Sequence, residues 1–365
     1  MHRPSALHQA HCIAFLSFVR IEQPLMEIGI DSFVASHHSG PTGDVERVRQ
    51  LLEQIELADR EGLDVFGIGE HHRPDYVSSA PAVLLAAAAA RTSRIRLASA
   101  VTVLGTEDPV RVFQQFATVD LVARGRAEIV AGRGSFVESY PLFGCDLEDY
   151  DALFAEKLEL LLRLRSSTRV SWSGRFRPPI DDRGVYPRPA QERLPVWIAS
   201  GGTPASIARA ARLGLPVVVA IIGGQPAQFR PLFDLYRSTA SAHASPGADH
   251  RLGLHSIGFV ADTDAQARET FWPGWRDVFT RLGRERGWAP PTRAQFEAQC
   301  DPHGALVVGS PETVTAKLLA TRHALGGLDR VNVVLDNALL THEQTMHATR
   351  LLATRVAPAL RAAVD

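Results

Sequence analysis

The sequence predicts a single (β/α)8 barrel, that is, a TIM barrel with insertions, and three observations carry this prediction. The chain has 365 residues, which is a usual length for such a barrel with added loops. Eight short runs rich in Val and Ile recur along it, in alternation with amphipathic helical stretches. Several runs are apolar almost throughout, as parallel strands covered on both faces are. A doubly wound open sheet is the alternative, and the number of strands favours the closed barrel.

The predicted elements begin after Met26. The strands are Glu27–Phe33, Asp64–Gly69, Ile95–Leu104, Ala127–Ala131, Val196–Ser200, Pro216–Ile222, Leu252–Val260 and Arg330–Asp336. The helices are Asp44–Glu61 with Asp44 as its N-cap, Pro81–Arg91, Pro109–Val122, Leu147–Arg165, Pro204–Leu213, Ala265–Arg286, Pro311–Leu325 and His342–Leu360. Two stretches, 166–194 and 287–310, fall outside this alternation. They are long enough to be lids or entrance loops.

Composition excludes several classes of protein. The net charge is -1, so nothing indicates an electrostatic grip on nucleic acid or on a membrane surface. The three cysteines, Cys12, Cys145 and Cys300, are widely spaced and form no Cys-x-x-Cys motif. This usage fits a reducing compartment, and we expect a cytoplasmic protein.

The N-terminal 25 residues do not resemble a targeting segment. The apolar run 12–19 is too short to span a bilayer, and Arg20-Ile21-Glu22 follows it where a signal peptide would carry small residues. We therefore expect residues 1–25 to be an extension, with Met26 as a possible alternative start. Residues 26–365 should form one domain.

Polar residues follow the second strand directly, as Glu70-His71-His72. In a TIM barrel the active site forms at the C-terminal ends of the strands, so this position points to function. Side chains alternate along a strand, and His71 and His72 should therefore point in different directions. Position alone leaves two interpretations open: a pocket histidine, or two structural histidines at the rim.

The fourth and fifth strands end in glycine-rich turns. Arg133 lies between Gly132 and Gly134, where a guanidinium could reach a phosphate or a ligand carbonyl, or could be a surface arginine beside a tight turn. After the fifth strand comes Ser200-Gly201-Gly202-Thr203-Pro204. Thr203 is a plausible N-cap, and the two glycines let the backbone approach a ligand. The start of the next helix then favours an anion such as a phosphate monoester, although an ordinary strand–helix junction would have the same caps.

Taken together, these motifs resemble those of the bacterial luciferase-like flavin monooxygenases. The resemblance extends from Met26 to the C-terminus, and the combination is specific although each motif alone is weak. The similar elements are Glu70–His72, the stretch 99–144 with Asp108–Arg111, Gly125-Arg126 and Arg133-Gly134, then Ser200–Gly202, Leu213–Pro216 and Gly309–Glu312. Light-emitting members have a cysteine where this chain has Gly132, so bioluminescence is not expected.

The resemblance implies a barrel that binds reduced FMN, which reacts with O2 to oxidise a small organic substrate. It implies catalytic roles for His71, the pocket histidine near the reactive part of the flavin, and for Glu70 beside it. A histidine with a pKa near neutrality could exchange protons during the reaction. By position, the cofactor-binding residues would be Ala100 and Val101 at a non-prolyl cis peptide bond, Arg133, and the phosphate cradle Ser200, Gly201, Gly202 and Thr203.

The resemblance further implies a separate flavin reductase and a homodimer, and three alternatives stay open. A deazaflavin-dependent hydride-transfer enzyme of the same superfamily would share the fold, although Glu-His-His favours a flavin. A non-catalytic flavin-binding protein would keep the fold without turnover. A metal-dependent barrel hydrolase needs His-x-His on the first strand, but that strand ends Asp31-Ser32-Phe33.

Overall fold

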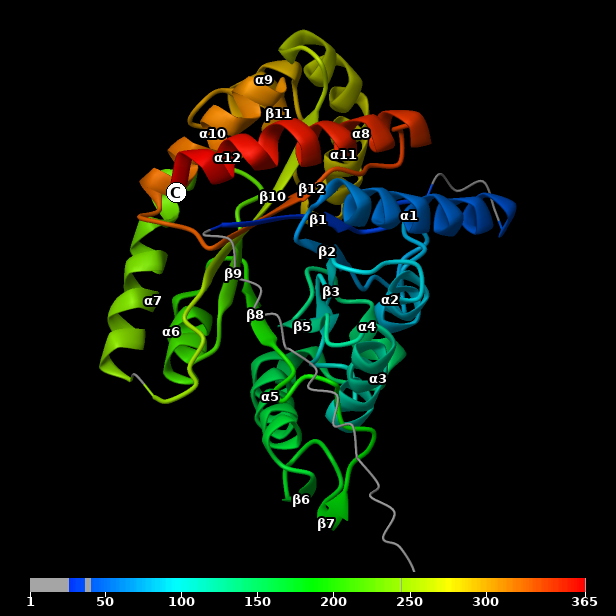
Figure 1. The fold of residues 1–365 in the computed structure, drawn as a ribbon, viewed down its shortest axis with the longest axis vertical. Coiled ribbons are helices and arrows are strands. Elements are labelled where there is room, and N and C mark those ends of the chain that lie inside the picture. The colour runs from blue at the N-terminus through cyan, green and yellow to red at the C-terminus, as the bar shows by residue number, and fades with distance from the viewer. Residues whose placement is uncertain (1–25, 37–40, 244, 365) are drawn as a thin grey trace, which may run out of the picture.

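Eight parallel strands close into a barrel in a computed structural model that describes residues 26–36, 41–243 and 245–364 (Figure 1). The strands are β1 (Glu27–Ser32), β2 (Val65–Ile68), β3 (Arg96–Ser99), β5 (Ala127–Gly132), β8 (Val196–Ser200), β9 (Val217–Ala220), β10 (Leu252–Val260) and β12 (Arg330–Val334). Each pairs with the next in this order, and β12 pairs back with β1. The predicted barrel is confirmed, and all eight predicted strands are present. The expectations for residues 1–25 concern a part of the chain outside the described residues.

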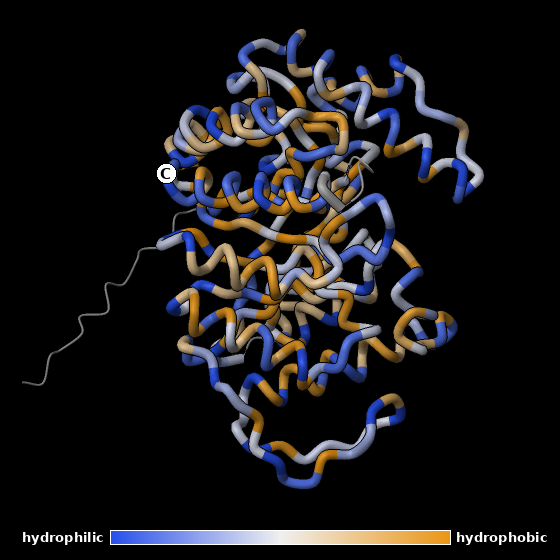
Figure 2. Tube along the Cα trace, turned by 90° about the vertical axis from the view of Figure 1, so that its right-hand side faces the viewer, coloured by the Kyte–Doolittle hydropathy of each residue, from blue (hydrophilic) through white to orange (hydrophobic). Residues whose placement is uncertain are grey.

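Helices surround the barrel on its outer side (Figure 1). They are α1 (Pro41–Glu61), α2 (Pro81–Ala89), α3 (Pro109–Val122), α5 (Tyr150–Ser166), α6 (Pro204–Arg212), α7 (Arg230–Ala242), α8 (Asp264–Arg286), α10 (Pro311–Ala324), α11 (His342–Leu351) and α12 (Ala357–Val364). A π-helical turn, Leu352–Val356, joins α11 to α12. None of the described helices is long and apolar enough to cross a bilayer. Hydrophobic residues lie mainly along the inner side of this arrangement (Figure 2).

The structure corrects several of the predicted elements. Helix α1 begins at Pro41, so Asp44 lies in its first turn and is not the N-cap. A carboxylate is also favourable there because it faces the positive end of the helix dipole. The predicted third strand is divided into β3 and β4 (Thr102–Val103). Helix α7 was not predicted.

The stretch 166–194 forms an antiparallel hairpin of β6 (Arg169–Trp172) and β7 (Ile180–Gly184), which lies far from α8 in Figure 1. Its tip contacts the outer helices: Arg177 pairs with Asp108 at 3.0 Å, and Glu156 of α5 accepts a hydrogen bond from the Phe176 amide at 3.0 Å. The hairpin therefore braces α3 and α5 on the outside of the barrel, a different place from the lid that we expected.

A buried ionic cluster fills the N-terminal end of the barrel. The guanidinium of Arg330 lies between Glu27 and Glu128 at 2.6 Å from each, and its Cζ atom is 4.2 Å from the ring centre of Trp197. Burial by itself raises the pKa of Glu128, but the charges of Arg330 and Arg96 outweigh it and hold this pKa well below its usual range. Glu128 and Arg330 are therefore both ionised near neutral pH, and the cluster closes the end of the barrel opposite to the predicted site.

Candidate active site

On five of its strands, the opposite end of the barrel carries only small residues. In the middle of the barrel, Val65, Ala98, Val130, Trp197 and Val218 form a separate apolar cluster. Because side chains alternate along a strand, the next inward residue on each of these strands lies two positions further on. These residues are Gly67, Ala100, Gly132, Ala199 and Ala220. None has a side chain beyond Cβ, so these five strands contribute no large side chain to a further layer at the mouth.

The side chains of Glu70-His71-His72, which follow β2, point in two directions, as the alternation of side chains along a strand predicts. His72 turns towards Glu70, with 3.0 Å between its Nε2 atom and the Glu70 Oε1 atom. The other carboxylate oxygen of Glu70 accepts a hydrogen bond from the backbone amide of Val103 in β4 at 2.8 Å. One Glu70 oxygen therefore ties the end of β2 to β4, and the other holds the His72 ring within the same loop. This geometry suits a positioning role for Glu70 and His72, and the catalytic role expected for Glu70 stays a prediction.

Replacing Glu70 with alanine should lower the free energy of unfolding by about 1–3 kcal/mol, because the buried Val103 amide loses its acceptor. Glu70→Gln is the matched control, since its amide oxygen can still accept from Val103 and its amide nitrogen can donate to His72. Urea unfolding of both variants checks this. Equal losses of stability in the two variants would contradict the role of the Val103 hydrogen bond.

His71 points the other way, into a cluster of aromatic rings. Its ring centre lies 4.8 Å from that of Phe33, 4.4 Å from that of Tyr76 and 5.4 Å from that of Phe136. Its Nε2 atom is buried and has no hydrogen-bond partner in the described part of the chain. Burial, with smaller contributions from the nearby charges of His72 and Arg73, lowers the pKa of His71 to about 3. The expectation of a pKa near neutrality was therefore wrong: the ring is neutral, and one of its nitrogens has no hydrogen-bond partner among the described residues.

Arg133 and the start of α6 come together, as the sequence predicts for a phosphate site. The Nη2 atom of Arg133 lies 3.3 Å from the hydroxyl of Ser206, in the first turn of α6, and its guanidinium lies 4.8 Å from the ring centre of Tyr150. Arg133 also forms an ion pair with Asp151, whose carboxylate is largely exposed. The Arg133 guanidinium and the N-terminus of α6 therefore face the same small region, where both would stabilise an anion.

The turn between β8 and α6 leaves its backbone accessible. Gly202 has φ +111°, a conformation that favours glycine, and a Cβ atom on Gly201 would meet nothing within 4 Å. The Ser200 hydroxyl accepts a hydrogen bond from the Gly202 amide at 3.2 Å and so braces the turn. Thr203 occupies the N-cap position, but its side chain makes no capping hydrogen bond. Its hydroxyl therefore stays available at the helix start.

The Ala100–Val101 peptide bond is cis, as expected from the resemblance. It lies between β3 and β4, and the Ala100 amide donates to the Ile68 carbonyl of β2 at 2.7 Å. A side chain on Gly132 would collide with Val101, because a Cβ there would be 2.7 Å from a Val101 methyl group. Glycine at position 132 thus leaves room for the Val101 side chain, which lies between β3 and β4.

The C-terminal half of α8 reaches the loops that follow β2 and β5. Glu285 pairs with Arg73, Arg281 pairs with Asp75, and Arg286 donates to the Ser135 carbonyl at 3.1 Å. The Arg73 guanidinium in turn lies 4.5 Å from the ring centre of Phe136, which covers His71. Polar contacts at the surface therefore hold α8 beside the aromatic cluster.

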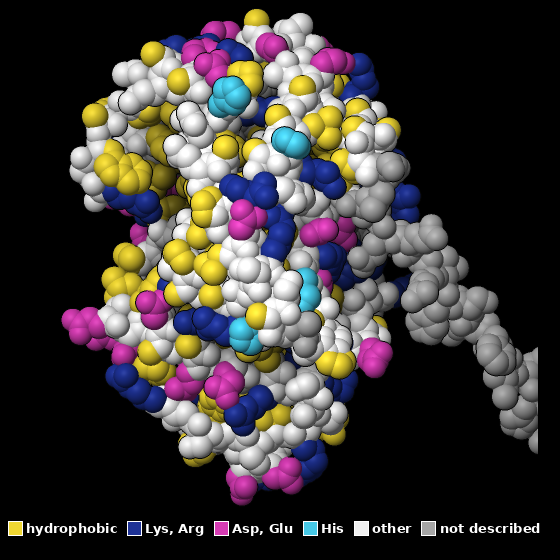
Figure 3. Space-filling view, turned by 90° about the vertical axis from the view of Figure 1, so that its left-hand side faces the viewer, with side chains coloured by type: hydrophobic (Ala, Val, Ile, Leu, Met, Phe, Trp, Pro, Cys, Tyr) yellow, Lys and Arg dark blue, Asp and Glu magenta, His cyan; other side chains and the backbone are white. Residues whose placement is uncertain are grey.

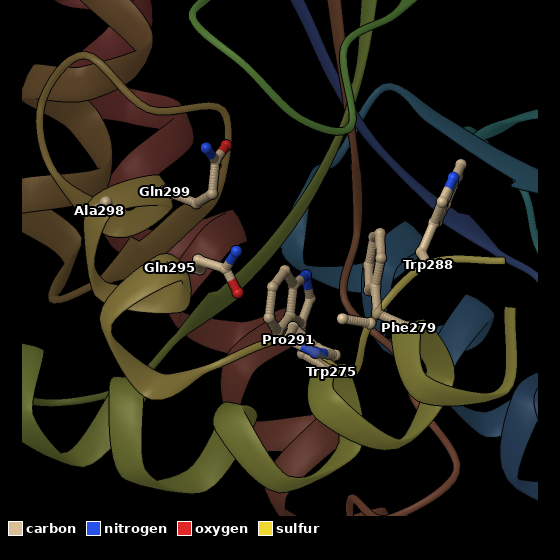
Figure 4. Close-up of a pocket in the computed structure, with 8 residues that line it drawn as sticks. Trp275, Phe279, Trp288, Pro291, Gln295, Ala298 and Gln299 are labelled. Atoms are coloured by element: carbon tan, nitrogen blue, oxygen red, sulfur yellow. The ribbon is translucent and has the colours of Figure 1, made fainter. Parts of the chain in front are cut away.

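Behind this part of α8 lies an apolar pocket of about 320 Å³ (Figure 4). Trp275 and Phe279 of α8 line it together with Trp288, and Gln295 and Gln299 come from α9 (Arg293–Cys300). The stretch 287–310 thus contributes to a pocket next to the helix that borders the mouth. In the space-filling view the outline is notched below the end that carries α8 and α9, and hydrophobic side chains gather around the notch (Figure 3).

Three polar residues that no sequence motif marked come together inside the barrel. His255 of β10 lies 2.6 Å from Asp31 of β1 through its Nδ1 atom, and Asn332 of β12 donates to the same carboxylate at 2.7 Å. Their spacing in the sequence gives no motif. The available signal was the presence of polar residues within strands that are otherwise rich in apolar residues.

Comparison with known proteins identifies the class of protein that this fold and site define. The profile of the luciferase-like monooxygenase family matches residues 26–329. The chain belongs to this family, and it is an enzyme of the luciferase-like monooxygenase class.

Two relatives show how far the similarity extends. Limonene 1,2-monooxygenase from Rhodococcus erythropolis is 25% identical over 340 residues, which cover 91% of this chain and 86% of that protein. The protein y4vJ from Sinorhizobium fredii is 28% identical over 221 residues, 60% of this chain. That match spans 62% of y4vJ, which is less than two thirds of its length.

Solved structures share the fold at lower identity. A monooxygenase from Streptomyces bottropensis superposes with a TM-score of 0.80 at 24% identity, over 91% of this chain and 99% of that one. The oxygenating constituent of 3,6-diketocamphane monooxygenase from Pseudomonas putida, in complex with FMN, has a TM-score of 0.74 at 19% identity, and the match covers 92% of this chain and 98% of that one. The coenzyme F420 dependent tetrahydromethanopterin reductase from Methanopyrus kandleri has a TM-score of 0.68 at 17% identity, and the match covers 91% of this chain and 99% of that one.

Proposed function

We propose that this protein is an FMN-dependent monooxygenase that uses reduced flavin and O2 to oxidise a small organic substrate. The observation that carries the proposal is the convergence of Arg133 and Ser206 beside the open Gly201-Gly202 turn. FMN ends in a phosphate monoester, which suits a guanidinium next to a helix start. The space left by the small residues at the mouth offers a place for a flat ring system.

The chain's own residues would bind and shield the cofactor. Arg133, Thr203 and the first turn of α6 would hold the phosphate, and the Ala100–Val101 peptide would lie against the ring. The flavin supplies the electrons that activate O2. His71 would donate or accept one hydrogen bond at Nε2, while Phe33, Tyr76 and Phe136 exclude water around it. A separate reductase and a homodimer remain predictions.

The charge around Arg133 favours FMN over a deazaflavin. Asp151 pairs with Arg133, and its side chain is 75% exposed. Coenzyme F420 extends beyond its phosphate into a long acidic tail, which this carboxylate would repel, whereas FMN ends at the phosphate. Titration of the purified protein with FMN, riboflavin, FAD and coenzyme F420, followed by fluorescence, tests the proposal. Tighter binding of coenzyme F420 than of FMN would favour the hydride-transfer alternative.

Replacing Arg133 with alanine should weaken FMN binding about 10- to 100-fold, because a charged hydrogen bond to the phosphate is lost. Riboflavin lacks the phosphate, so its affinity should be the same for the variant and the wild type. Asp151→Asn is the matched control, since it keeps the shape of the site and releases Arg133; FMN should bind it at least as tightly as the wild type. A parallel loss of riboflavin affinity in Arg133→Ala would show that Arg133 does not bind the phosphate.

A further inference from the structure

A buried carboxylate–imidazole pair lies inside the barrel and has no role in the site described so far. Asp31, on β1, is 2% exposed, and its two oxygens have separate partners. Its Oδ2 atom is 2.6 Å from Nδ1 of His255, and its Oδ1 atom accepts a hydrogen bond from the Asn332 amide nitrogen at 2.7 Å. The three residues come from β1, β10 and β12, which are neighbours in the sheet.

The pair is in the layer of small residues at the mouth. A Cβ atom on Gly67 would collide with the Asp31 carboxylate, so Asp31 points inward into space that this glycine leaves. His255 is paired in register with Ala220, another member of that layer. The His255 side chain keeps 13% of its surface exposed. The pair therefore borders the space where the proposed cofactor and substrate would lie.

Phe33 separates this pair from His71. The ring of His255 stacks on Phe33 with centres 5.7 Å apart and 21° between the planes, and the same Phe33 meets His71 edge to face at 4.8 Å. The two histidines thus share one aromatic neighbour, but only His255 has a carboxylate partner. His71 stays neutral because burial lowers its pKa to about 3.

The hydrogen bonds fix which nitrogen of His255 is free. A carboxylate only accepts hydrogen bonds, so Nδ1 of His255 must carry the hydrogen in the pair. In the neutral ring Nε2 then holds a lone pair, and no hydrogen bond to it is found within the described residues. A buried carboxylate on Nδ1 also stabilises the imidazolium that forms when Nε2 takes up a proton.

We propose that the Asp31–His255 pair is the proton-exchanging group of the mouth, with Asn332 as the residue that orients Asp31. This inference rests on the proposed function. In the step, an O–H or N–H bond of the bound reactant breaks, and its proton forms the N–H bond at Nε2 of His255. Asp31 balances the charge, and the proton then passes to product or solvent.

Two titratable groups that share Phe33 with the pair do not change charge around neutral pH. These are His71, whose pKa burial lowers to about 3, and Tyr76, whose pKa burial raises to about 12. On the side of Ser32, Asp336 is paired with Arg47 at 2.9 Å. A pH-dependent limb of turnover that is lost with Asp31 or His255 would therefore belong to the pair and not to His71 or Tyr76.

Asp31→Asn provides the sharpest test. Asn332 still donates to the oxygen of residue 31, so the new amide nitrogen faces Nδ1 of His255 and forces the hydrogen onto Nε2. We expect turnover to fall about 100-fold or more, as on loss of a general base, and the pH limb to disappear. In the flavin-free protein, ¹⁵N NMR of the His255 ring should show the change from Nδ1–H to Nε2–H. FMN affinity should stay close to that of the wild type.

A surface pair serves as the matched control. His347 lies 3.1 Å from Asp262 and both side chains are exposed, so His347→Gln should leave turnover and its pH profile unchanged. If Asp31→Asn does not fold, His255→Gln tests the proposal instead, and we expect the same loss of turnover and of the pH limb. A variant with a lower melting temperature but unchanged turnover and pH profile would show that the pair is structural and would overturn the proposal. Loss of FMN binding in His255→Gln would also overturn it. Failure of the wild type to bind any flavin would instead refute the proposed function.

Discussion

Replacing Arg330 with leucine will lower the free energy of unfolding by about 3–5 kcal/mol at neutral pH. Arg330 is 2% exposed and lies between the carboxylates of Glu27 and Glu128, so its removal leaves two negative charges buried beside each other. Urea unfolding, followed by circular dichroism, measures the effect. Arg251 reaches Glu27 only at 3.4 Å and is 21% exposed, so Arg251→Leu is the control and should cost about 1 kcal/mol or less.

The stability deficit of Arg330→Leu should narrow as the pH falls. In the wild type the folded pKa of Glu128 is held below its usual range, so the stability that the cluster contributes is present above the unfolded pKa and is lost as the pH falls through the folded one. In the variant Arg330 no longer offsets burial, so the pKa of Glu128 in the folded state rises. Lowering the pH then protonates Glu128 and removes the cost of burying its negative charge. A deficit that grew towards acid pH would contradict this account of the cluster.

Replacing His71 with phenylalanine will lower turnover about 100-fold or more, and FMN affinity will change little. Phenylalanine keeps the ring among Phe33, Tyr76 and Phe136 but removes the unpartnered Nε2 atom, so the loss reports on the hydrogen bond and not on packing. Steady-state turnover with an externally supplied reductase measures the effect, together with FMN titration of the same sample.

The pH profile separates the two histidines. Because the pKa of His71 is lowered to about 3, His71→Phe should keep the wild-type pH profile at a lower height, whereas His255→Gln should lose any limb of that profile that belongs to the Asp31–His255 pair. Unchanged turnover in His71→Phe would remove His71 from the mechanism. Flavin binding without turnover in the wild type would favour the non-catalytic alternative.

Local sequence identified the barrel because each strand carries its own signal. Buried parallel strands are short apolar runs in the sequence, and all eight runs became barrel strands whose ends lie at most five residues from the expected ones. The predictions were wrong where contacts between residues distant in the sequence decided the structure. The hairpin in 166–194 lies along α5 through Glu156 and Arg163, contacts that no local pattern contains.

Within the candidate site, too, local sequence and tertiary contacts decided different properties. The sequence by itself determined which residues arrive at the mouth: Glu70, His71, Arg133 and the turn Ser200–Thr203 follow strands whose ends meet. Only the tertiary structure decided their states. Glu70 is bound at both oxygens, His71 is neutral under three aromatic rings, and Asp31 meets His255 across the barrel. Burial and partner charges set protonation, and both depend on residues brought together from distant strands, so no single stretch of sequence could reveal them.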